Sequence, residues 1–250
     1  MRKIYIACIV VFSLIGLKAQ QAETPDRAWL FGASIGANSA QGDWSQQFGT
    51  NYTIGAHLGR KLKSNYTFTL EWDYLFGSDI PNRNGALNNL LTEDGNLINL
   101  NGSYAQVNIN QRGTFVNFGL EKTVPWLSPN LNSGFNVGVF GGYAWHWLNV
   151  DNVGNDSPQV IDEYEKGYDR LGQGFQLRQS FGYIYLSESR LVNFKLSFEL
   201  NQIWSQDMRA YYYPIGELSN ETQFNMLYSL KLKWYIPIYL GGKTEEYYFN

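Results

Sequence analysis

The segment LVNFKLSFELNQIW occupies positions 191–204 and alternates in chemical character along most of its length. Apolar side chains recur at every second position from Val192 to Leu200, and polar or charged residues such as Lys195 and Glu199 stand between them. Successive side chains of a β-strand point to opposite faces. The segment therefore predicts a strand with one apolar face and one charged face.

The same alternation recurs in seven other segments of the chain. They are residues 29–37, 52–62, 65–76, 105–122, 135–148, 175–186 and 224–240. Most exceed the roughly 9–11 residues that a tilted strand needs to cross a bilayer. In one of them, 105–122, the apolar phase changes around residues 111–113, which predicts a β-bulge at Gly113 or the rim of the sheet.

The connections between these segments alternate in length. Residues 63–64 and 187–190 are short turns and 124–133 is a modest one, whereas the long connections are 38–49, 78–104, 149–174 and 205–222. Outer-membrane barrels have short periplasmic turns and long outer loops. We therefore predict an all-β fold: an eight-stranded antiparallel up-and-down transmembrane β-barrel with four long extracellular loops. The alternative is a secreted eight-stranded sandwich, whose exposed face should be richly charged.

The composition agrees with a membrane barrel. The 250 residues include 8 Trp, 18 Tyr and 15 Phe, and only 16% are charged, against about 25% in an ordinary soluble domain. This argues against a cytosolic enzyme, a disordered tail or a coiled coil. The 19 basic residues form no patch and the formal charge is −3, so nucleic acid is not expected as a partner.

The first 20 residues have the organisation of a secretory signal peptide. Arg2 and Lys3 precede an apolar run over residues 4–17, and the expected cleavage edge is Ala19 or Gln20. An N-terminal membrane anchor is the alternative, but a spanning helix needs about 20 apolar residues. We therefore divide the chain into a signal peptide (1–20), an outer-membrane barrel (21–240) and a periplasmic tail (241–250). An even strand number places both termini of the mature chain in the periplasm.

The charged residues on the inward phase suggest what fills the barrel. Eight strands leave an interior just wide enough for side chains. Isolated ions in a low dielectric are costly, so we expect acids and bases to pair there. The predicted lumen ionic network comprises Glu71, Asp73, Glu121, Glu199, Lys61, Arg178, Lys195, Lys231 and Lys233. A narrow ion- or proton-conducting path is the alternative, although small barrels are normally filled.

No catalytic centre is predicted. His57 and His146 are the only histidines and both fall on the inward phase, away from an evident nucleophile and orienting acid. A lipid A-modifying enzyme is retained as an alternative function. Asp151 and Asp156 lie close together but do not follow the spacing of a calcium loop. We predict no metal and no cofactor.

The long loops are the candidate interaction sites, because loops of such length without function are uncommon. Charged and tyrosine side chains interleave in the 149–174 loop. The candidate contact residues are Asp162, Glu163, Tyr164, Glu165, Tyr168 and Asp169. The loops 78–104 and 149–174 are expected either to bind a partner at the cell surface or to pack over the barrel mouth.

Several segments carry a family resemblance. They are EYEKGYDRL at 163–171 with the strands that follow it, residues 92–104, and the closing strand LKLKWYIPIY at 230–239. The chain resembles small eight-stranded outer-membrane β-barrel proteins of Bacteroidota. The predicted barrel contacts outer-membrane lipid. The resemblance implies contact with envelope proteins as well, as an accessory subunit of a machine for secretion, gliding or barrel assembly. It implies no catalytic residue.

Overall fold

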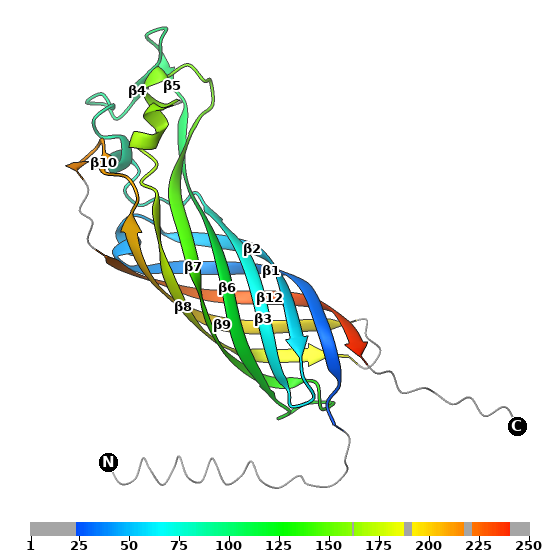
Figure 1. The fold of residues 1–250 in the computed structure, drawn as a ribbon. Coiled ribbons are helices and arrows are strands. Elements are labelled where there is room, and N and C mark those ends of the chain that lie inside the picture. The colour runs from blue at the N-terminus through cyan, green and yellow to red at the C-terminus, as the bar shows by residue number, and fades with distance from the viewer. Residues whose placement is uncertain (1–23, 162, 188–191, 218–221, 241–250) are drawn as a thin grey trace, which may run out of the picture.

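The computed structural model describes residues 24–161, 163–187, 192–217 and 222–240 (Figure 1). The predicted signal peptide, the C-terminal tail and Asp162 lie outside the described residues. Eight long strands dominate the chain. They are β1 (Arg27–Gly42), β2 (Thr50–Lys61), β3 (Tyr66–Gly77), β6 (Val107–Val124), β7 (Gly134–Asn152), β8 (Gly172–Leu186), β9 (Asn193–Asp207) and β12 (Gln223–Leu240).

These strands close into one antiparallel barrel in the order β1-β12-β9-β8-β7-β6-β3-β2. Each strand pairs with its neighbours in the chain, and β1 closes the ring on β12 from Arg27↔Leu240 to Gly42↔Asn225. The predicted eight-stranded up-and-down barrel is confirmed. We call the end where β1 begins and β12 ends the base.

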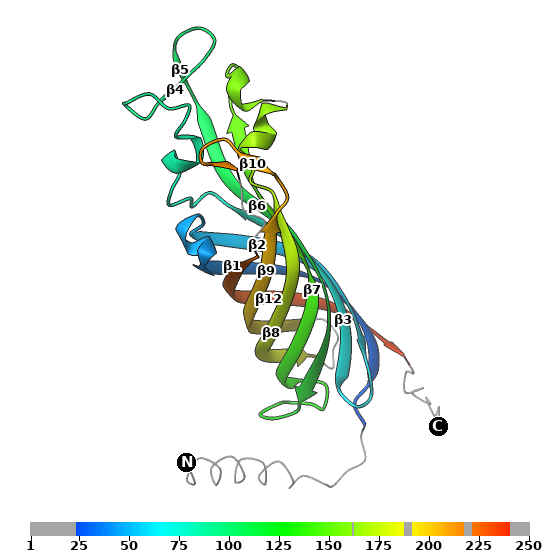
Figure 2. The same ribbon diagram turned by 60° about the vertical axis from the view of Figure 1, so that its left-hand side comes forward.

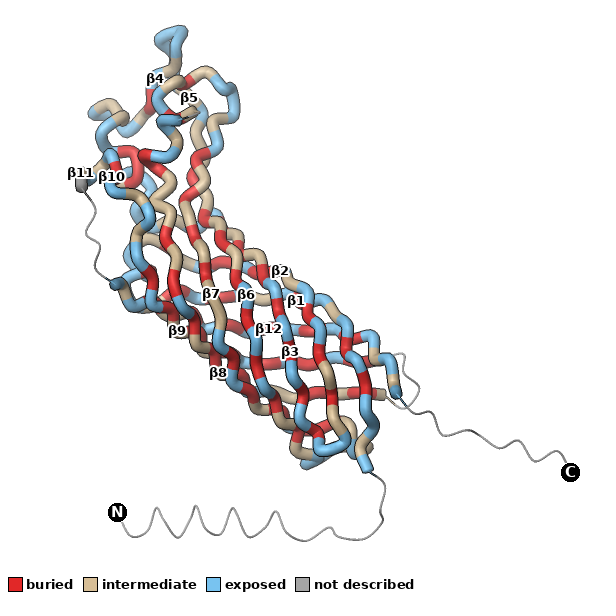
Figure 3. The backbone as a smooth tube through the Cα atoms, in the orientation of Figure 1, coloured by how far each residue is buried: buried red, intermediate tan, exposed pale blue. Residues whose placement is uncertain are grey.

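The outward face of the barrel is apolar. Along each strand, buried residues alternate with exposed ones (Figure 3), and the exposed set includes Phe68, Phe118 and Phe198. This is the inverse of a soluble sandwich, whose apolar face is buried, and it suits a face in contact with lipid. We call the apolar part of this outward face the apolar band. Toward the end opposite the base the outward side chains become polar, at Thr114 of β6 and Asn149 of β7, and there the band ends.

The predicted bulge at Gly113 is absent. The β6–β7 register runs without interruption from Val107↔Asn152 to Val124↔Phe135. The alternative prediction, a rim at this point, is close to what is found, because β3 ends at Gly77 opposite Gln111.

The four long connections all lie at the end opposite the base. They hold short 3-10 helices and two small hairpins, β4 (Leu97–Ile98) with β5 (Tyr104–Ala105) and β10 (Tyr211–Tyr212) with β11 (Gly216–Glu217). The outer parts of β6 and β7 rise past the rest of the barrel to meet them (Figure 2). We call the described residues of 78–106, 153–171 and 208–222, with these strand ends, the cap. No helix in the described part of the chain is long and apolar enough to cross a membrane.

Candidate functional site

The inward side chains form three layers between the base and the cap. Nearest the base lies a small apolar cluster of Ala28, Leu30, Ile184, Leu186 and Tyr235. The middle layer is ionic. The layer nearest the cap is apolar again and includes Trp44, Phe48, Phe115, Leu148 and Ile203. The lumen is thus occupied by side chains over its length, as expected for eight strands.

The middle layer contains an ionic network of three acids and three bases. Arg178 of β8 binds Glu71 and Asp73 of β3, and its Nη1 lies 3.4 Å from Glu199 Oε2. Lys231 Nζ donates to Asp73 Oδ2 at 2.8 Å and lies 3.3 Å from Glu199 Oε2.

The sixth member, Lys233, bridges Glu71 and Glu199. None of the six side chains is more than 3% exposed. The three positive and three negative charges balance, which offsets the large desolvation cost of burying each ion.

Two other predicted members form a separate ion pair. Lys195 of β9 binds Glu121 of β6, and Thr69 Oγ1 donates to the second oxygen of that carboxylate at 3.3 Å. Phe140 is a fully buried apolar residue beside the network that the alternation of 135–148 does not predict. The Arg178 guanidinium carbon lies 4.1 Å from the centre of its ring, a favourable cation–π arrangement.

Lys61 does not join the network, contrary to prediction. Its Nζ donates to the Asp26 carbonyl at 3.1 Å and to Asn132 Oδ1 at 2.8 Å. The cause is its position, because Lys61 is the last residue of β2 and lies at the base. Periodicity assigns a side chain to the inward face, but not to a height along the barrel.

The apolar layer near the cap explains the apparent phase change in 105–122. Odd-numbered residues of β6 face inward throughout, so Ile109 and Phe115 point into this layer while Glu121 points into the ionic one. The lumen itself changes from polar to apolar along the strand, and the strand keeps its phase.

The two histidines are buried without the partners that catalysis requires. His146 Nε2 lies 3.4 Å from Ser205 Oγ, but among the described residues Nδ1 has no hydrogen-bond partner. The centre of the Trp44 ring lies 4.6 Å from the centre of the His146 ring, in an edge-to-face contact. His57 packs 4.7 Å from the Tyr235 ring near the base. In the part of the chain that the structure describes, neither histidine is hydrogen-bonded to an acid in the way a catalytic base is.

The candidate contact residues of the 149–174 loop divide into two groups. Glu163 and Tyr164 are exposed and Glu165 is half-buried. Tyr168 is only 3% exposed, because it packs inside the cap and accepts a hydrogen bond from Asn89 Nδ2 at 3.0 Å.

Asp169 is half-buried and binds Arg209, with Nε donating to Oδ1 at 3.0 Å. Tyr168 and Asp169 therefore join loops to one another, and the prediction that Tyr168 faces a partner is wrong. Burial inside the cap also raises the pKa of Tyr168 and raises that of Tyr212 to about 12, since the charged phenolate is poorly solvated there.

In the described part of the chain, no group of three or more His, Cys, Asp or Glu side chains is arranged to hold a metal ion. The acids of the lumen are already neutralised by bases, and those of the cap are dispersed.

Comparisons with known proteins add little beyond the fold. No protein-family model matches this sequence, and no curated protein matches it. Among solved structures, the chain is similar to Ail, the attachment invasion locus protein of Yersinia pestis in complex with the heparin analogue sucrose octasulfate, at 5% identity over 84% of this chain and 99% of that one, with a TM-score of 0.45.

It is also similar to Neisserial surface protein A, at 9% identity over 82% of this chain and 96% of that one, with a TM-score of 0.43. Values this low carry no functional inference. The closed antiparallel sheet, the apolar outward band and the long loops at one end are this chain's own features, and they are those of an outer-membrane β-barrel.

Proposed function

We propose that the chain is a non-catalytic protein of the bacterial outer membrane, whose filled barrel holds a folded cap at the cell surface for contact with other envelope proteins. In this proposal residues 1–20 direct export, the base and both termini face the periplasm, and the apolar band contacts outer-membrane lipid. The cap then stands outside the membrane.

The observation that carries the proposal is the continuity of packing between lumen and cap. One buried apolar cluster joins Phe115 and Ile203 of the barrel to Leu87, Val160 and Tyr168 of the cap. Loops that shared no core with the barrel would be free to move and would present no fixed surface. A cap seated on a packed lumen supports a binding role, because its contact residues are ordered before a partner arrives.

The outer surface of the cap also favours a protein partner. On the β4–β5 hairpin, Leu100 is 73% exposed, Tyr104 66% exposed and Ile98 is exposed beside them. Tyr211 and Ile215 are exposed on the β10–β11 hairpin. These side chains lie beyond the apolar band, so lipid does not account for them. Exposed apolar groups gathered on projecting hairpins are typical of protein contact sites.

The alternatives have less support. A narrow channel requires a continuous path, whereas two apolar layers and a balanced ionic layer occupy the lumen. A lipid A-modifying enzyme requires an oriented base near a nucleophile, whereas His146 Nδ1 has no hydrogen-bond partner among the described residues and its ring packs against Trp44. The finer proposal, an accessory subunit of a secretion, gliding or barrel-assembly machine in Bacteroidota, rests on the sequence resemblance.

The test is co-purification with and without the cap. A C-terminally tagged full chain is expressed in its own envelope beside a variant in which residues 80–105 are replaced by a short Gly/Ser linker. Both are purified in mild detergent and the bound proteins are quantified by mass spectrometry. We expect a stoichiometric envelope protein with the full chain and its loss from the linker variant, while the barrel stays folded by circular dichroism.

A bare barrel in both preparations would contradict the proposal. Discrete conductance steps in planar bilayers would then favour the channel. A change in the lipid A mass spectrum on His146→Ala would favour the enzyme.

A further inference from the structure

Among the described residues, none pairs with one edge of β6 where the strand enters the cap. Its neighbour β3 ends at Gly77, opposite Gln111. Residues 107–110 of β6 continue and, within the described ranges, pair with β7 alone, from Val107↔Asn152 to Asn110↔Asn149. Just before them, β5 pairs with β4 through Ala105↔Leu97. An open stretch of strand edge, residues 106–110, thus lies between the end of β3 and the β4–β5 hairpin.

Backbone groups of this stretch point into the opening. Val153 N donates to the Gln106 carbonyl at 3.1 Å across the β6–β7 pair, so even-numbered residues of this stretch face β7. Backbone groups of successive residues alternate in direction, so those of Val107 and Ile109 face the open edge. Among the described residues, the only hydrogen bond to these edge groups is donated by Arg83 Nη2 to the Val107 carbonyl.

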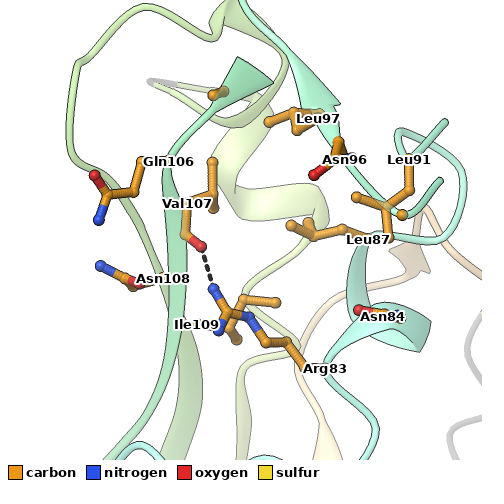
Figure 4. A pocket seen from close by; sticks show the side chains of 12 residues that line it. Arg83, Asn84, Leu87, Leu91, Asn96, Leu97, Gln106, Val107, Asn108 and Ile109 are labelled. Carbon is orange, nitrogen blue, oxygen red and sulfur yellow. Dashed lines mark hydrogen bonds between the residues drawn. The ribbon is translucent and has the colours of Figure 1, made fainter.

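A groove of about 410 Å³ runs along this edge (Figure 4). The four consecutive residues from Gln106 to Ile109 all line it. Figure 4 shows Gln106 and Asn108 on one side of the strand and Val107 and Ile109 on the other. Consecutive side chains point to opposite faces, so a cavity that touches all four lies against the edge itself. We call this cavity the edge groove.

The lining of the edge groove has a defined chemistry. Leu87, Leu91 and Leu97 form an apolar wall on the side of Val107 and Ile109. Among the described lining residues Arg83 carries the only charge, and its partner is a carbonyl oxygen instead of a carboxylate. The edge groove therefore offers unpaired backbone donors and acceptors, an apolar wall and one uncompensated positive charge.

We propose that the edge groove binds an extended polypeptide segment of a partner protein, which adds as a short strand to β6 between β3 and the β4–β5 hairpin. Main-chain hydrogen bonds to Val107 and Ile109 supply the pairing, as in other cases of strand addition. An apolar side chain of the segment packs on the leucine wall, and an acidic one replaces the Val107 carbonyl as the partner of Arg83. The inference deepens the proposed function and rests on it, since the segment belongs to the envelope partner.

The length of the opening sets the probe. Five residues at about 3.4 Å each span about 17 Å. The probe is the fluorescein-labelled, C-terminally amidated pentapeptide Val-Glu-Val-Glu-Val, measured by fluorescence anisotropy against the full chain in detergent micelles. Three comparison peptides are used. One carries Lys in place of Glu, and the other two carry N-methyl groups on alternate amides, one peptide for each register. We expect the acidic probe to bind, the lysine peptide to bind about tenfold more weakly, and the methylated peptides not to bind.

Matched variants separate the edge from the side chains. Val107→Pro removes an N–H that faces the opening and leaves the β6–β7 ladder intact, as proline is tolerated at such positions. Val107→Thr keeps that N–H and serves as the control. We expect Val107→Pro to weaken binding about fivefold or more and Val107→Thr to leave it unchanged. Arg83→Gln should remove the preference for the acidic peptide. Circular dichroism confirms that each variant is folded.

Strand addition is wrong if no pentapeptide binds at millimolar concentration, if the methylated peptides bind as well as the parent, or if folded Val107→Pro binds like the wild type. The native partner gives an independent reading. If the native partner is lost with Val107→Pro but kept with Val107→Thr, the inference is supported. If the partner is kept with both variants, it contacts another part of the cap, and the proposed function still stands. If no partner co-purifies with the wild type, the proposed function fails, and the peptide measurements still decide whether the edge binds a strand.

Discussion

Replacing Glu199 with Gln would remove one of the three carboxylates in the ionic network while keeping the shape of the side chain. Glu199 is fully buried, and its oxygens lie within 3.3–3.4 Å of Arg178, Lys231 and Lys233. Ser197 Oγ donates to Glu199 Oε1 at 3.2 Å, and an amide oxygen can accept that bond as well. The substitution therefore isolates the effect of charge from that of packing.

The magnitude follows from the charge balance. After the change, Arg178, Lys231 and Lys233 share only Glu71 and Asp73, which leaves one uncompensated positive charge in a lumen without solvent access. Breaking a buried ion pair by removing one partner costs about 3–5 kcal/mol. We expect the free energy of unfolding to fall by about this amount.

The assay is urea unfolding of the full chain in detergent, followed by tryptophan fluorescence. Lys61→Met is the control, because Lys61 is also a buried charged residue but lies outside the network. The Lys61→Met variant should lose only about 1 kcal/mol of its free energy of unfolding. The double variant Glu199→Gln/Lys231→Met restores a neutral network. Its loss of unfolding free energy should be smaller than the summed losses of the two single variants by at least about 1 kcal/mol. A Glu199→Gln protein within about 0.5 kcal/mol of the wild type, or strictly additive variants, would refute the reasoning.

Three further predictions concern the lipid face and the cap. Phe198→Arg should destabilise the barrel by about 2–4 kcal/mol in lipid vesicles, since Phe198 is exposed on the apolar band near mid-strand; a neutral result would place Phe198 away from lipid. Asp169→Asn should weaken its link to Arg209 and speed trypsin cleavage of the cap, whereas unchanged cleavage would show that the pair does not hold the loops. Burial raises the pKa of Tyr212 to about 12, whereas a tyrosine in the unfolded chain has a pKa of about 10. The folded cap therefore keeps its full stability below about pH 10 and becomes less stable as the pH rises toward 12, because the unfolded chain loses this proton first. Proteolysis of the cap should therefore increase over that pH range in the wild type and increase less in Tyr212→Phe. Equal increases in the two proteins would contradict a role for Tyr212 in the pH dependence.

The barrel could be predicted from sequence because its signal is local. A period of two residues identifies a strand and separates its faces within a single segment, as Phe194 and Lys195 illustrate. The count and lengths of the segments then specify an eight-stranded barrel. The inward position of Arg178, Glu71 and Glu199 follows from the same periodicity.

The height of each side chain along the barrel could not be predicted, because it depends on strand tilt and register between distant segments. For this reason the alternation groups Lys61 with the network, although Lys61 lies at the base. Phe115 and Phe140 were missed for a related reason. An apolar residue on the inward phase interrupts the alternation, and without the third dimension it resembles a change of phase.

The cap was the least predictable part. Its contacts join residues far apart in the sequence, such as Asn89 with Tyr168 and Asp169 with Arg209. No local pattern reveals such pairs, so charged and tyrosine side chains that link loops were read as surface contacts. The edge groove was missed as well, because an unpaired strand edge depends on where a neighbouring strand ends.

The most direct test of the account is site-specific photocrosslinking in living cells from position 104. Tyr104, exposed on the β4–β5 hairpin, is replaced by a photoreactive phenylalanine analogue, and the same analogue at lipid-facing Phe198 is the control. We predict one discrete protein adduct from position 104, identified by mass spectrometry, and none from position 198. The absence of an adduct at position 104, or the same adducts from both positions, would contradict a cap that binds an envelope partner.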